Sequence, residues 1–436
     1  MPGANGNNFL IRTFHTAARG KKVHPILFPY GNGHVEVTID CPNSPTIIDY
    51  HSEADGSAEG IIEEALRHPV AGKPLHELAA GRSRAVILVS DGTRLCPSRL
   101  FLPALLGALN RGGIADDRIR IVVALGMHRK HTDAELKRLV GEEAFERVAV
   151  VNHSALSEDC VAVGTTSLGT PIEINRLVVE ADLLIATGNI EPHRLVGVSG
   201  GVKALIPGTA SHRCIEANHA LSGRYKAALG DPDNPIHRDL EEALAFVPIH
   251  FLFNVIANHR QELLEAYSGE LIPTHRRGLE AARKRFFVPV SSQYDIILAS
   301  TGGSPKDLQL YQAIKTMQNA SAFTKPGGSI VLLARCEELF GNGIFQYWVE
   351  TIRDRPTMLR KLKEQFVLGA HKVAQIEQIV SKHTVYLYSD MPDALTELAG
   401  FIPVRDLQQL VSSVINNEDC EVAMMPHGAL TFPAPE

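Results

Sequence analysis

This 436-residue sequence has few cysteines, and none of them are closely spaced. Its six cysteines are scattered along the chain, and no two of them form a Cys-x-x-Cys pair. Cysteine-built zinc modules and disulfide frameworks both depend on such regular spacings. The composition therefore argues against both classes, and we expect reduced thiols with mostly structural roles.

An excess of positive charge and a long apolar run are also missing. The chain has 43 Lys and Arg against 49 Asp and Glu, a formal net charge of −6. A basic surface for nucleic acid or anionic membrane is therefore not expected. The apolar runs are too short to span a membrane, and the first 22 residues contain no continuous apolar stretch typical of a secretion signal. We expect a cytoplasmic protein that binds neither nucleic acid nor membrane.

Short apolar runs recur along the chain at regular intervals and alternate with helical patterns. The first four cover residues 85–90, 119–125, 148–151 and 182–187. Apolar, often β-branched runs that alternate with helices are typical of a buried parallel sheet. The series resumes beyond residue 290, with runs at 294–300, 328–334, 384–389 and 420–425. The sequence therefore predicts an α/β protein.

The length of the chain and a break in this series predict two domains, because 436 residues exceed the usual size of one core. The segment 286–290 marks the passage between the two series of runs. We expect residues 1–287 to form one domain and residues 288–436 to form the other, each with a mainly parallel sheet flanked by helices.

Polar segments follow each of the first four runs. They are residues 90–94, 126–132, 152–153 and 188–219. An open α/β sheet binds its ligand at the carboxyl ends of its strands, so these segments are expected to meet at one edge. Single members also fit structural roles, since an aspartate such as Asp91 often caps a helix and many histidines only contribute to packing.

The segment 188–219 contains a Ser199-Gly200-Gly201 turn followed by Lys203. Such a turn directs backbone N–H groups toward an anion, although the pattern Gly-x-x-x-x-Gly-Lys-Ser/Thr of a Walker A loop is absent. Lys203 is then either a cation beside a bound phosphate or a nucleophile toward a carbonyl-type carbon. The residues alone favour the phosphate role.

In the second domain, Tyr311, Gln312 and Lys315 fall on a predicted helix. Tyr311 and Lys315 share one face of it, and Gln312 lies three residues before Lys315. A solvated helix face accounts for this trio from composition alone. Lys306 is a competing candidate for a substrate-facing cation.

Together these motifs resemble the nickel-dependent lactate racemase family. The longest is Gly-Asn-x-x-Pro-His-x-x-x-Gly-x-Ser-Gly-Gly-x-Lys-x-x-x-Pro-Gly at 188–208, followed by Asn218-His219. Asp-Gly-Thr-Arg at 91–94, Gly-Met-His-Arg at 126–129 and Tyr-Gln-x-x-Lys at 311–315 stand in the family's order. The chain departs from the family where Leu95-Cys96 precedes the proline that usually follows the Asp-x-Thr-Arg motif directly.

The resemblance implies a cofactor and a role for each motif. The cofactor is a nickel-pincer nucleotide, pyridinium-3,5-bisthiocarboxylic acid mononucleotide, linked covalently to Lys203, with His219 binding its nickel. His128 and His193 match the two catalytic histidines. The resemblance assigns cofactor contacts to Asp91, Thr93, Arg94, Ser199, Gly200, Gly201 and Tyr311. It assigns the substrate to Arg94, Gln312 and Lys315.

The implied activity is racemisation or epimerisation of lactate or a related 2-hydroxy acid. It proceeds by reversible hydride transfer to the nickel-pincer nucleotide, with histidines as acid and base. The active site would lie in the cleft between the two domains, and the cofactor-building enzymes would be partners. Two alternatives stay open: a transferase that uses 199–203 as a phosphate cradle, and a nucleotide-binding module without turnover. The sequence selects neither the 2-hydroxy acid nor the oligomeric state.

Overall fold

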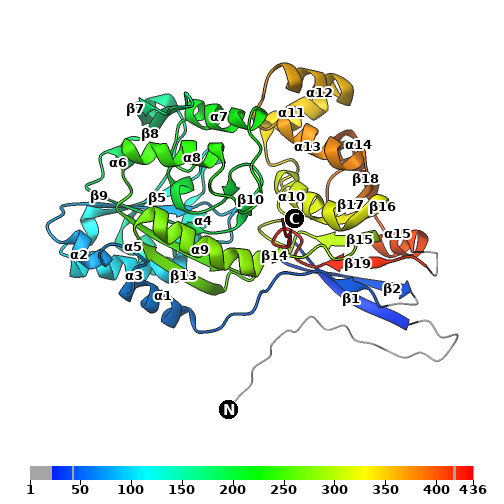
Figure 1. The fold of residues 1–436 in the computed structure, drawn as a ribbon, viewed down its shortest axis with the longest axis horizontal. Helices are drawn as coiled ribbons and strands as arrows, with labels where there is room; N and C mark the ends of the chain where they lie inside the picture. Colours follow the sequence, from blue (N-terminus) through cyan, green and yellow to red (C-terminus); the bar gives the residue numbers. More distant parts are fainter. Residues whose placement is uncertain (1–21, 42–43, 416–418, 436) are drawn as a thin grey trace, which may run out of the picture. The chain divides into compact units, whose positions relative to one another are not determined.

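The computed structural model describes residues 22–41, 44–415 and 419–435. They fall into two compact units, which Figure 1 colours along the chain. One unit comprises His51–Phe286, and the other combines the residues up to Tyr50 with Phe287–Ala434. Both have an α/β architecture.

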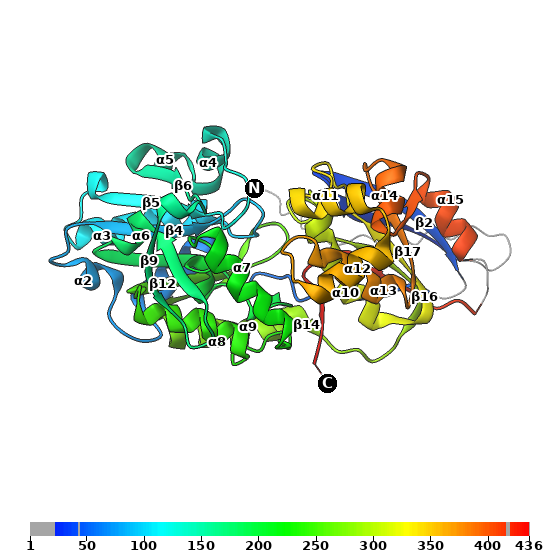
Figure 2. The same cartoon turned by 90° about the horizontal axis from the view of Figure 1, so that it is seen from above.

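The unit His51–Phe286 is built on a six-stranded sheet in the order β13-β12-β9-β4-β5-β6, and Figure 2 shows most of these strands side by side in this order. All neighbours are parallel except β12 and β13, which form an antiparallel hairpin. The strands are β4 Ala85–Ser90, β5 Ile119–Ala124, β6 Ala149–Asn152, β9 Leu183–Asn189, β12 Phe251–Ala257 and β13 Leu263–Gly269. The four apolar runs predicted as parallel strands are therefore confirmed.

One face of this sheet carries the main hydrophobic core of the unit. Ile87 and Val89, alternate residues of β4, pack there with Phe101 and with residues of five helices. These helices are α1 Ala58–Arg67, α2 Leu75–Ala79, α3 Ser98–Arg111, α4 Asp133–Val140 and α5 Glu142–Arg147. The strands are apolar on both faces because the sheet is covered on both sides.

The remaining elements of this unit follow β6 in the sequence. Its other helices are α6 Arg176–Val179, α7 His212–Ala220, α8 Pro235–Glu242, α9 Leu271–Phe286 and the 3-10 turn η3 Gly201–Ala204. Two small hairpins pair β7 Cys160–Thr165 with β8 Pro171–Asn175, and β10 Pro192–His193 with β11 Gly197–Val198. The helix α9 packs on β12 and β13, while α8 and α9 both contact η3. These contacts determine where the Ser-Gly-Gly turn lies.

The second unit has a fully parallel sheet in the order β18-β17-β16-β15-β19-β3. Its strands are β3 Thr46–Ile47, β15 Tyr294–Ser300, β16 Thr324–Leu333, β17 Thr384–Tyr388, β18 Ile402–Val404 and β19 Val422–Met425. Its helices are α10 Leu310–Phe323, α11 Gly343–Ile352, α12 Arg355–Glu364, α13 His371–Val380, α14 Asp393–Ala399 and α15 Leu407–Val414. A short ladder pairs β14 Phe287–Val288 with β20 Phe432–Pro433.

The first three strands of the chain belong to the second unit, although the sequence placed residues 1–287 in one domain. The hairpin of β1 Lys22–Tyr30 and β2 Gly33–Cys41 packs on Ile296 and Leu298 of β15. Figure 1 shows these two blue strands beside the second sheet. The strand β3 pairs with β19. Nearly 380 residues separate these partners, so local pattern carries no signal of the pairing. Residues 1–21 lie outside the described residues.

A buried carboxylate, that of Asp239 on α8, connects three elements of the first unit. It accepts hydrogen bonds from Thr166, from Thr170 Oγ1 at 2.6 Å and from Asn218 Nδ2 at 2.8 Å. Asp239 is 1% exposed. A buried donor without an acceptor is costly, so these bonds fix α7, and with it His219, against α8.

We expect Asp239→Ala to lower the free energy of unfolding by about 3 kcal/mol, because it leaves three buried donors without their acceptor. Urea denaturation followed by circular dichroism measures this change. The exposed Asp233 on the preceding turn is the matched control, and Asp233→Ala should shift stability by less than about 0.5 kcal/mol. Equal stability of the two variants would contradict the assignment.

Candidate active site

The loops after β4 and β5 meet at the carboxyl edge of the first sheet. His128 Nδ1 lies 3.3 Å from Asp91 Oδ2, and Arg94 Nε lies 3.6 Å from the same oxygen. The backbone N–H of Gly92 donates to His131 Nε2 at 3.0 Å. Asp91 therefore lies between a histidine of the next loop and the arginine of its own motif.

The Asp91 carboxylate stays ionised although its side chain is only 4% exposed. Burial alone would raise its pKa, but His128, Arg94 and the hydrogen bonds from Thr93 hold that pKa well below the usual value. Thr93 donates to Oδ1 from both its backbone N–H and its hydroxyl. A fixed negative charge beside Nδ1 favours the proton on that nitrogen, which leaves the lone pair of His128 on Nε2. His128 thus has the form of a general base, oriented by a carboxylate.

His193 is held differently, on the short strand β10. Its Nδ1 accepts from the backbone N–H groups of Leu195, at 3.2 Å, and Val196, at 3.4 Å. The proton of the neutral ring therefore belongs on Nε2. The opposite residue in the hairpin is Gly197, with φ of +82°, where a Cβ would come within 1.8 Å of Asp231 O. Only glycine fits this turn, so the turn keeps His193 in place.

The Ser-Gly-Gly turn is fixed by bonds within the protein. Ser199 Oγ donates to Asn189 O and accepts from Glu191 N, both at 2.8 Å. Gly201 N–H donates to Asn254 Oδ1 at 2.8 Å. These groups already have partners, so they differ from the anion-directed donors that the sequence suggested.

Two of the residues that hold this turn were not identified from the sequence. Asn254 of β12 accepts from Gly201 N–H through Oδ1 and donates to the Gly188 carbonyl through Nδ2, the second bond at 3.1 Å. His275 Nε2 donates to Ser199 O at 2.8 Å. Both are fully buried. They lie more than 50 residues beyond the turn, and no motif around them marks the contact.

Lys203, on η3, is partly buried directly after this turn. Burial and the positive charge of Arg94 lower the pKa of its amine well below the usual value. The pKa of the His219 imidazole on α7 is also lowered, to about 3. Burial is the larger cause and the positive charge of Lys203 the second. Arg94 thus lies close enough to Lys203, and Lys203 close enough to His219, for their charges to interact. A lowered pKa favours the neutral form of each group, in which its nitrogen has a lone pair to donate.

The predicted residues of the second unit lie on α10 and contact α13. Lys315 Nζ donates to Gln312 Oε1 at 2.7 Å, and Gln312 is 4% exposed. The ammonium of Lys372 lies 4.4 Å from the centre of the Tyr311 ring, and His371 meets that ring edge-on. Tyr311, Gln312 and Lys315 therefore belong to an interacting cluster that includes two residues of α13. The sequence alone gave no role to these two residues, His371 and Lys372.

Two family models match this chain. The lactate racemase N-terminal domain matches residues 30–230, and the lactate racemase C-terminal domain matches residues 290–431. The lactate racemases of Thermoanaerobacterium thermosaccharolyticum and Lactiplantibacillus plantarum are each 33% identical to it. The alignments cover 85% and 80% of this chain, and 89% and 84% of those relatives, respectively.

Solved structures agree with these matches. The lactate racemase apoprotein from T. thermosaccharolyticum superposes with a TM-score of 0.82 at 31% identity, over 94% of this chain and all of that one. A Thermotoga maritima protein of 18% identity shares the fold, with a TM-score of 0.68 over 88% of this chain and 99% of that one.

The fold and these relatives define an isomerase of the racemase class. The chain belongs to the lactate racemase family. No helix in the ranges that the structure describes is both long and apolar enough to cross a membrane.

Proposed function

We propose that this protein racemises lactate or a closely related 2-hydroxy acid with a nickel-pincer nucleotide carried on Lys203. The observation that carries the proposal is the neighbourhood of Lys203, His219 and Arg94, together with the Asp91–His128 pair at the same sheet edge. The names of the two relatives, both lactate racemases, support the substrate class.

The residues present suit such a cofactor. The lowered pKa of Lys203 favours the unprotonated amine, which is the form that forms covalent bonds. The buried Nδ1 of His219 makes no hydrogen bond of good geometry within the described residues. A neutral imidazole is a good ligand for nickel. When bound, the nucleotide would supply a reversible hydride acceptor.

The proton steps fall to the two histidines. His128 would take the hydroxyl proton of the substrate on Nε2, because Asp91, 3.3 Å from Nδ1, stabilises the imidazolium that forms. His193 rests with its proton on Nε2 and first acts as a hydrogen-bond donor to the substrate oxygen. It would serve as the base for the other enantiomer after the hydrogen bonds from Leu195 and Val196 to Nδ1 break, because the ring proton can then lie on Nδ1 and the lone pair on Nε2.

The substrate carboxylate would be bound by Arg94, Gln312 and Lys315. The amide oxygen of Gln312 accepts a hydrogen bond from Lys315. The amide NH2 of Gln312 therefore points away from Lys315 and would donate to the substrate carboxylate. Arg94 is 34% exposed and adds a cation that pairs with a carboxylate in a bidentate manner.

A transferase with a phosphate cradle is the weaker alternative. Such a cradle needs donors that point at the phosphate, whereas Ser199 Oγ and Gly201 N–H bond to Asn189 and Asn254.

Peptide mass spectrometry tests the proposal on protein co-expressed with the cofactor-building enzymes and purified without oxygen. We expect a nucleotide-sized, sulfur-containing addition on Lys203 in the peptide 195–213, and no tryptic cleavage at that lysine. The same protein should convert one lactate enantiomer into a mixture, as chiral chromatography would show. An unmodified Lys203 in a protein without nickel would reject the nickel-pincer nucleotide.

A further inference from the structure

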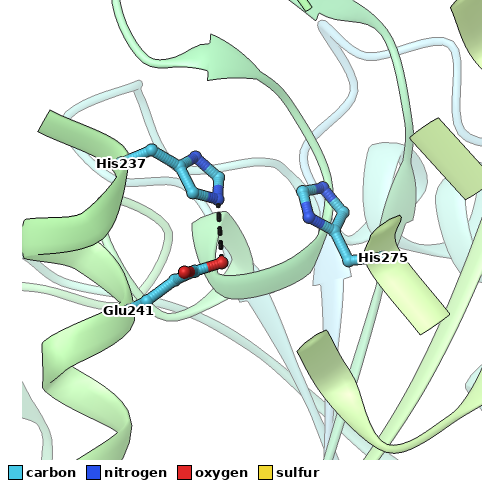
Figure 3. A group of neighbouring side chains, drawn as sticks. All are labelled: His237, Glu241 and His275. Carbon is cyan, nitrogen blue, oxygen red and sulfur yellow. Dashed lines mark ion pairs between the residues drawn. The ribbon is translucent and has the colours of Figure 1, made fainter. Parts of the chain in front are cut away.

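Three potential metal ligands, separate from the predicted cofactor residues, lie together between α8 and α9. They are His237, Glu241 and His275, and one ligand atom of each lies within 4.8 Å of the others. Figure 3 shows that the two imidazole rings and the carboxylate point toward one another. Both histidines are 0% exposed and the Glu241 side chain is 14% exposed.

The backbone explains this convergence. His237 and Glu241 are four residues apart on α8, so they share one face of the helix. His275 comes from α9, and its ring lies parallel to that of His237 with centroids 5.5 Å apart. Two helices therefore supply two nitrogen donors and one carboxylate.

The hydrogen bonds leave the lone pairs of the cluster facing inward. His275 Nε2 donates to Ser199 O at 2.8 Å, which leaves the lone pair of the neutral ring on Nδ1. A backbone carbonyl bound to the second ring nitrogen is typical of metal-ligating histidines. His237 makes no hydrogen bond of good geometry through either ring nitrogen, although Nε2 is 3.3 Å from Glu241 Oε1. Neighbouring donors of a tetrahedral zinc ion with bonds of about 2.0–2.1 Å lie at a similar separation.

We propose that His237, Glu241 and His275 form a binding site for a zinc-class divalent cation, separate from Lys203 and His219. Two imidazoles and one carboxylate suit borderline ions such as Zn²⁺. Since His275 also holds the Ser199 carbonyl, a bound ion would fix the turn that precedes Lys203 to both helices.

One cation already faces the cluster, the guanidinium of Arg276. Its Nη1 lies 3.0 Å from Glu241 Oε1 and 3.4 Å from His275 Nδ1, and its Nη2 lies 3.1 Å from Glu241 Oε2. It also lies 3.7 Å from Asp233, whose side chain is 65% exposed. Arg276 therefore has a second acceptor toward solvent, and the ion would take its place beside Glu241.

Isothermal titration of the chelator-treated, full-length protein with Zn²⁺ tests this site. We expect one tight site that Glu241→Gln weakens at least about 100-fold, since loss of even an outer partner of a metal site costs about 10–100-fold. Arg276→Met should strengthen binding, because it removes the competing cation. His219→Ala is the control and should leave this site unchanged.

Crystals soaked in Zn²⁺ locate the ion. An anomalous peak about 2.0–2.1 Å from His237 Nε2 and His275 Nδ1 supports the site. The proposal is overturned if the wild-type protein shows no such peak, or if Arg276→Met binds no more tightly than the wild type. Zinc found only at His219 or on exposed histidines also overturns it. None of these outcomes depends on racemase activity.

Discussion

His128→Ala is expected to lower the turnover number for lactate racemisation by about 10³-fold, within the usual range for the loss of a general base. The expectation rests on the proposed function. The imidazole lies 3.3 Å from the ionised Asp91 carboxylate, and no other described side chain is paired with that carboxylate as a base. Chiral chromatography from either pure enantiomer measures the rate.

Asp91→Asn separates the role of the ring from that of its orientation. An amide beside Nδ1 cannot stabilise the imidazolium, so the rate should fall by about 10²-fold or more while the ring remains. The exposed His212 on α7 is the matched control, because its one ion-pair partner among the described residues is Glu216, at 3.8 Å. His212→Ala should keep full activity. A fully active His128→Ala protein with bound nickel would remove the base assignment.

Under the proposed function, Lys203→Ala is expected to abolish racemisation, because the nucleotide attached to this side chain would supply the hydride chemistry. The amine is partly buried, and its lowered pKa gives it the reactive form. The variant should contain no covalent nucleotide by mass spectrometry and no nickel by elemental analysis. Racemisation should fall to the background rate.

Two further variants separate attachment from metal binding. Lys203→Arg keeps a positive charge but lacks the nucleophilic amine, so it should fail like Lys203→Ala. His219→Ala should retain the adduct on Lys203 and lose nickel. A Lys203→Arg protein that racemises lactate at the wild-type rate would show that the lysine serves only as a cation.

The two helical residues His237 and Glu241 show what local sequence can and cannot indicate. Their spacing of four residues gives them a common helix face, but that pattern is frequent in helices without any site. Only the packing of α9 against η3 brings His275 to the same point and turns Nδ1 toward them. The third residue of the cluster, His275, lies 34 positions beyond Glu241, which is why the sequence did not predict the cluster.

Local pattern by itself determined most of the two sheets and the polar segments that follow their strands. Runs such as 85–90 and 119–125 are apolar because both faces of a parallel strand are covered, and this property is visible along the chain. The motifs around Asp91, His128 and Lys203 each follow the end of such a strand. Because a parallel sheet presents the carboxyl ends of its strands at one edge, the sequence also predicted that these motifs meet there.

Tertiary structure alone decided which distant segments complete these elements. It pairs β3 with β19, covers β15 with the first hairpin, and fixes the Ser-Gly-Gly turn through Asn254 and His275. These contacts join residues that are 50 to several hundred positions apart, and each depends on a shape that forms only when the chain packs. Hydrophobic periodicity records which face of an element is buried, but it does not record which partner buries it.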